Sequence, residues 1–253
     1  MKHFYRHILI ITAIFAGFLC FSCTDFFTTS LFPWASRNPN DIIPKVTKDN
    51  VDDLIELFEN DPDGSLALLK KIKDAAGEAS GDEKNQLLGA ALEAAVNASG
   101  LGQAIISAAG NINNLKDEED VRGMLLETMD KLTNLEETSA ILSGMLPKPG
   151  DYPDHPNPEF LEFCDKAKTE DLAMAAVVLL LGVASKSCDG DFNALLDDPL
   201  KFLDNKNLDF KDSVELAQAM ALVAAIKGKD EILEKDSPLR NILEHLNLIS
   251  VLP

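Results

Sequence analysis

Apolar residues recur at helical spacing along almost the whole chain after residue 46. In the first example, Val51, Leu54, Ile55 and Phe58 stand at positions i, i+3, i+4 and i+7, on one face of an α-helix. No stretch alternates apolar and polar residues as a half-buried strand does. The chain is therefore expected to be all-α, with helical hairpins stacked as a bundle or a solenoid-like array. Similar apolar lines predict further helices over residues 66–72, 87–96, 121–132, 142–145, 160–163, 172–184, 192–196, 216–226 and 239–246.

The helix starts near residues 61, 80 and 133 carry capping signals. Asp61 followed by Pro62 suits the N-cap and the first position of the helix that contains residues 66–72, and Gly77 is expected to end that helix. The segments 80–83 and 133–136 each place Glu three residues after Ser or Thr. This spacing predicts a capping box before each of the next two helices.

A proline-rich segment, residues 147–158, interrupts the helical pattern and is the candidate boundary within the body. It holds five of the 12 prolines, and a helix cannot cross it. Neither residues 45–146 nor residues 159–253 show an obviously separate core, so one continuous stack is preferred. Residues 172–175 and 216–219 have similar sequences, which fits either a helical repeat or any Ala-rich bundle. The uncharged run 172–184 predicts a fully buried helix.

The first 22 residues have the layout of a bacterial secretion signal that ends before a lipidated cysteine. Lys2 and Arg6 precede an apolar run over residues 8–21, which is too short for the ~20 residues of a membrane span. Cys20 follows a bulky leucine, whereas Cys23 follows Ser22, so Cys23 is the expected site of lipid attachment. The alternative is an ordinary cleaved signal without lipid.

Residues 23–44 read as a lipidated tether and arm that precede a helical domain over residues 45–253. The arm is crowded with aromatic side chains and also carries several prolines, which suit an extended segment. The rings are expected to pack on the helical body as a docking arm, and contact with the membrane interface is the alternative. The aromatic residues of this candidate arm are Phe26, Phe27, Phe32 and Trp34.

The charge of the chain argues against polyanionic partners. The formal net charge is −19, and removal of residues 1–22, which carry two cations and no anion, moves it to −21. Nucleic acid and anionic headgroups are therefore disfavoured. We find no HExxH, GxSxG or Gly-rich phosphate loop in the sequence. An enzyme is accordingly not expected, and neither is a metal or any cofactor other than the lipid on Cys23.

Two further cysteines could form a disulfide in an oxidising compartment. Cys164 precedes the buried helix and Cys188 lies at its far end. Eighteen helical residues span ~27 Å, whereas bridged Cα atoms lie within ~7 Å. The bridge therefore requires the short helix at 160–163 to fold back along its successor.

Several segments near the amino terminus carry a resemblance to known proteins. They are the loose lipid-attachment signal at Cys23 and residues 27–30, 35–39, 43–47 and 50–55. On these segments, about the first quarter of the chain, it resembles spirochaetal lipoproteins of the treponemal kind. The resemblance implies no activity. Stacked helix pairs also form the lipid-anchored accessory component of transporters that depend on periplasmic binding proteins, an analogy of fold alone.

These patterns lead to two functional hypotheses for a lipid-anchored protein that faces the periplasm or the cell exterior. The first is a protein-interaction or scaffold module. The second is a transporter accessory or a carrier that binds a small apolar ligand between helices 172–184 and 216–226. A wide apolar cavity between these helices would favour the carrier, and a solid core with a concave outer face would favour the module. Clustered carboxylates with perturbed acidity in a cleft would instead indicate an enzyme.

Overall fold

The computed structural model describes residues 42–104, 123, 127, 129–151, 155–188 and 213–227. The signal, the lipidated Cys23 and the aromatic residues of the arm lie outside this part. The chain divides into two compact units, Met1–Ile42 and Ile43–Pro253, and the helices described below belong to the second. The helices expected over 192–196 and 239–246 also fall outside the described residues, as does most of 121–132.

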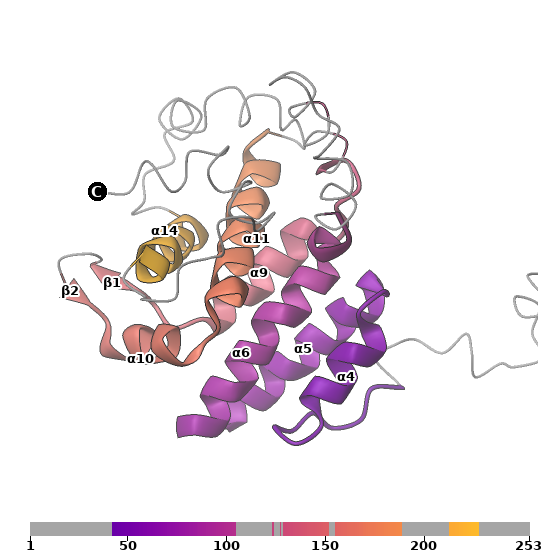
Figure 1. The fold of residues 1–253 in the computed structure, drawn as a ribbon, viewed down its shortest axis with the longest axis horizontal. Helices are drawn as coiled ribbons and strands as arrows, with labels where there is room; N and C mark the ends of the chain where they lie inside the picture. Colours follow the sequence, from indigo (N-terminus) through magenta and orange to yellow (C-terminus); the bar gives the residue numbers. More distant parts are fainter. Residues whose placement is uncertain are drawn as a thin grey trace, which may run out of the picture. The chain divides into compact units, whose positions relative to one another are not determined.

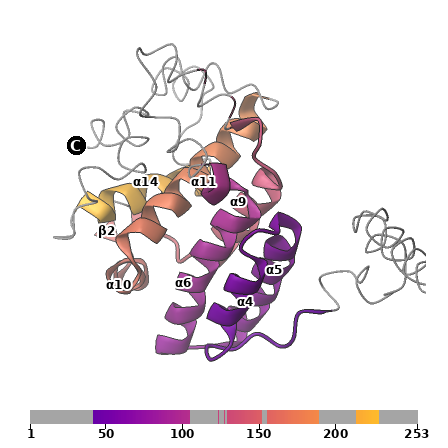
Figure 2. The same ribbon diagram turned by 45° about the vertical axis from the view of Figure 1, so that its right-hand side comes forward.

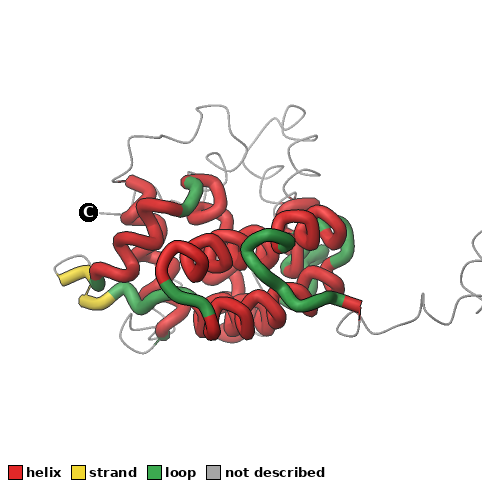
Figure 3. Tube along the Cα trace, turned by 90° about the horizontal axis from the view of Figure 1, so that it is seen from below, coloured by secondary structure: helices red, strands yellow, loops and turns green. Residues whose placement is uncertain are grey.

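The all-α prediction is confirmed, since 77% of the described part is helical. Figure 3 shows the helices with a single short hairpin at one edge of the described part. That hairpin pairs β1 (Gly150–Asp151) with β2 (His155–Pro156) inside the proline-rich segment, and its strands are two residues long. The described helices are α4 (Val51–Phe58), α5 (Pro62–Glu78), α6 (Gly81–Ala98), α9 (Leu135–Met145), α10 (Pro158–Lys166), α11 (Thr169–Cys188) and α14 (Val214–Lys227).

Helices α5 and α6 form a hairpin, and α9 and α11 link this hairpin to α14 (Figures 1 and 2). One hydrophobic cluster joins residues from both sides of the proline-rich segment, including Leu92 of α6, Phe163 of α10 and Leu179 of α11. Burial of this cluster is the main stabilising contribution, because removal of apolar surface from water dominates folding. Among the described helices, none combines the length and the apolar character of a membrane span.

The start of α5 follows the sequence prediction. Asp61 is the N-cap, and its carboxylate accepts a hydrogen bond from the Gly64 amide at 3.0 Å. Pro62 occupies the first helical position, where its missing N–H is not needed. The predicted end is wrong, because the helix passes Gly77 and continues to Glu78.

Both predicted capping boxes are wrong. Ser80 is the N-cap of α6, but its side chain makes no capping hydrogen bond, and Gly81 has φ of +58° instead of a helical value. At α9, the Thr133 amide donates to the Ser99 carbonyl at 3.1 Å. This hydrogen bond holds Thr133 in the segment that connects α6 to α9. Asn134 is the N-cap in its place, with φ of 52°, a left-handed conformation that Asn tolerates better than most residues.

Helices α9 and α11 approach closely at a glycine. A Cβ atom built on Gly182 would collide with the side chain of Ser139 in α9. Small side chains at this crossing allow the two helices to lie closer than larger ones would. Ser139 is fully buried, and its hydroxyl donates to the Glu136 carbonyl at 3.0 Å. The crossing therefore depends on the absence of a side chain at position 182.

A buried glutamine on α14 closes the carboxyl end of α9. The amide of Gln218 donates to the carbonyl oxygens of Ser143 and Leu146, at 3.0 and 3.3 Å. The last carbonyls of a helix have no partner within the helix, so this side chain supplies two of the missing donors. Gln218 is fully buried, and it lies within the helix that the sequence predicts over residues 216–226.

Candidate functional site

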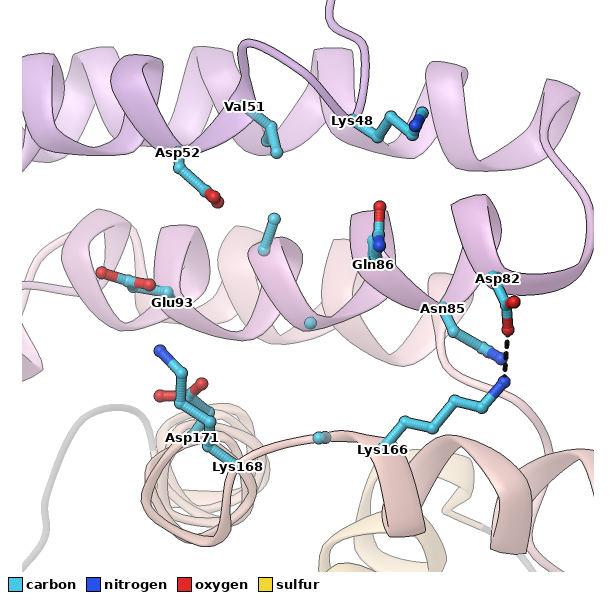
Figure 4. A pocket seen from close by; sticks show the side chains of 13 residues that line it. Lys48, Val51, Asp52, Asp82, Asn85, Gln86, Glu93, Lys166, Lys168 and Asp171 are labelled. Carbon is cyan, nitrogen blue, oxygen red and sulfur yellow. Dashed lines mark hydrogen bonds and ion pairs between the residues drawn. The ribbon is translucent and has the colours of Figure 1, made fainter.

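A groove of about 630 Å³ lies among the described residues, and its floor is one face of α6. Its walls are the start of α4 with the turn before it, and the turn from α10 into α11 (Figure 4). We call this concavity the α6 groove. It is lined by Lys48, Val51, Asp52, Asp82, Asn85, Gln86, Gly89, Ala90, Glu93, Lys166, Ala167, Lys168 and Asp171.

The α6 face belongs to this groove because of helical spacing. Positions 82, 86, 89 and 93 recur every three or four residues, so they form one stripe along the helix. The opposite side of α6 carries Leu88 and Leu92, which are buried in the core. The same amphipathic pattern that buries one face of α6 thus leaves a polar stripe toward the groove.

One end of the groove is closed by an ion-pair network between α6 and α10. The Lys166 ammonium contacts the carboxylates of Asp82 at 2.5 Å and Glu162 at 2.9 Å. The hydrogen bond from Lys166 lowers the pKa of Asp82, and the hydrogen bonds to Asp82 and Glu162 raise the pKa of Lys166. A second bridge, from Lys84 to Glu159 at 2.7 Å, ties the same two helices together. These groups are exposed, so each pair contributes little to stability alone.

Carboxylates gather at the other end of the groove. Asp52 comes from α4, Glu93 from α6 and Asp171 from α11, and Figure 4 shows them at the same end, opposite Asp82 and Lys166. Burial raises the pKa of Asp171, and the charges of Glu93 and Glu170 raise it further, while Lys168 acts in the opposite direction. Three carboxylates and the Lys168 ammonium therefore share this end of the groove.

The chemistry of this lining is that of charge recognition. Within the residues that the structure describes, no His, Cys, Ser or Thr lines the groove. No three His, Cys, Asp or Glu side chains of the described part come together as metal ligands. The carboxylates of Glu93 and Asp171 can accept hydrogen bonds and protons, and the lysines can donate.

A second concavity, of about 510 Å³, lies beside the start of α9. Two of the carboxylates that line it already have partners. Glu137 pairs with Lys70 at 2.7 Å, and Glu136 accepts a hydrogen bond from the Ser185 hydroxyl at 2.9 Å. Its polar groups are thus largely occupied, which makes the α6 groove the stronger candidate site.

The structure places the two predicted disulfide partners on different helices. Cys164 is buried in α10, with 3% of its surface exposed, and α10 lies beside the amino-terminal end of α11 (Figure 1). Cys188 is the last residue of α11, whose 20 residues span ~30 Å. The side chain of Cys188 lies outside the described part, so the bridge stays a prediction, which this placement disfavours. His155, in β2, is exposed.

Sequence reasoning missed the α6 groove. Its polar stripe on α6 looks like an ordinary solvent-facing surface, and the groove's closing ion pair joins Lys166 to Asp82, 84 residues apart. No spacing within the sequence indicates such a pairing. The acidic first turn of α6 and the basic last turn of α10 were the only available signals, and both are common at helix ends.

Comparison with models of protein families, with curated proteins and with solved structures finds no match for this chain.

Proposed function

We propose that the protein is a lipid-anchored helical module that binds a protein partner through the α6 groove. The observation that carries this proposal is the position of the groove: it lies on the outside of a packed helical stack and is lined by charged and amide side chains. Side chains of this kind fix the orientation of a polar partner. Anchoring through Cys23, a location in the periplasm or at the cell surface, and a role other than catalysis are parts of the same proposal.

The carrier hypothesis requires space between the Ala-rich helices. Helices α11 and α14 instead pack against each other, and Ala173, Ala176 and Ala219 are fully buried. Neither the α6 groove nor the concavity beside α9 is lined by residues from both of these helices. This packing supports the partner-binding module over a carrier of an apolar ligand.

The enzyme hypothesis requires carboxylates that cluster in a cleft and have shifted pKa values. Glu93 and Asp171 meet part of this requirement, because burial, together with the charges of Glu93 and Glu170, raises the pKa of Asp171. The described lining adds three lysines to this pair, but no imidazole, thiol or hydroxyl group. Carboxylates and lysines without such groups fit recognition of a polar partner more directly than they fit bond cleavage.

Site-specific photo-crosslinking tests partner binding at the groove. A benzophenone amino acid in place of Gln86, an exposed residue of the groove lining, is expected to give one discrete adduct in the native membrane. The same amino acid in place of Lys73, exposed on α5 outside the groove lining, is the matched control and is expected to give none. Equal adducts at both positions, or none at either, would contradict partner binding through the groove.

The anchor is tested by Cys23→Ser. Because a serine cannot form the thioether that carries the lipid, we expect the variant to move from the detergent phase to the aqueous phase in Triton X-114 partition. Labelled palmitate is expected to enter the unchanged protein and not the variant. The matched variant Cys20→Ser should keep both the label and the partition. Retention of label in Cys23→Ser would contradict attachment at this residue.

A further inference from the structure

We draw no further inference here: the strongest candidate, the open floor of the α6 groove at Gly89, belongs to the site already described, and nothing in the part of the chain that the structure describes shows what covers it.

Discussion

Replacement of Gly182 by alanine is expected to lower the free energy of unfolding by about 1–3 kcal/mol, the usual cost of an overpacked core. The added Cβ would collide with the Ser139 side chain, so α9 and α11 must move apart. Both helices contribute to the central cluster, which means that the separation also loosens contacts elsewhere. Urea unfolding followed by circular dichroism at 222 nm measures the change, with the slope of the transition checked for constancy.

The second variant in this experiment is Ser139→Gly, which removes the side chain that Gly182→Ala would strike. Combined with Gly182→Ala, it should recover part of the lost stability, and a double-mutant cycle isolates this coupling. The matched control is Gly144→Ala, since Gly144 lies on α9 and a Cβ built on it meets no atom within 4 Å. That substitution is expected to stabilise the helix by up to ~1 kcal/mol. Strictly additive effects of the two substitutions at the crossing would show that the helices do not meet there.

The helical body was predictable because its signals are local. The apolar line of residues 51–58 matches α4 to the residue, and the run 172–184 lies within α11. Asp61 and Pro62 mark a helix start through groups that are neighbours in the sequence. Such features depend on helical spacing alone, and the sequence specifies that spacing directly.

The error at the start of α9 has a physical cause outside the local sequence. The capping box at residues 133–136 matches the motif, but a hydrogen bond from Thr133 to Ser99 holds that backbone in the connection and moves the start of α9 to Leu135. The side chain of Asn134 is also engaged, since it donates to Asp63 at 3.0 Å. Each of these partners lies on a distant segment. Motif matching cannot include contacts that form only when segments remote in sequence pack together.

The α6 groove was unpredictable for the same reason. Its three carboxylates at one end come from α4, α6 and α11, and each is unremarkable within its own helix. Only the packing of α10 and α11 against α6 brings Asp171 toward Glu93 and Lys166 toward Asp82. With 42 acidic residues in the chain, no sequence argument could select these few.

Replacement of Phe163 by alanine is expected to cost about 3–5 kcal/mol, the range for loss of a fully buried aromatic side chain. Phe163 is 1% exposed and belongs to the same cluster as the side chains of α6 and α11. It thereby fixes α10, the helix that carries Lys166 to the wall of the α6 groove. The matched control is Leu161→Ala on the same helix, where the side chain is 41% exposed, and a change within about 0.5 kcal/mol is expected.

Loss of the Phe163 side chain should also displace the groove wall, because that wall depends on the attachment of α10 to the core. The ion pairs from Lys166 and Lys84 are exposed and contribute little alone. The buried side chains of α10, which are Phe160, Phe163 and Cys164, must therefore supply most of the attachment. Native-state hydrogen exchange should show faster exchange of α10 amides in Phe163→Ala than in Leu161→Ala, and the Asp82 pKa should rise toward its ordinary value as contact with Lys166 is lost. If exchange in α10 is unchanged while the free energy of unfolding falls, Phe163 stabilises the helical body and not the attachment of α10. In that case the ion pairs, rather than the core, would determine the position of the groove wall.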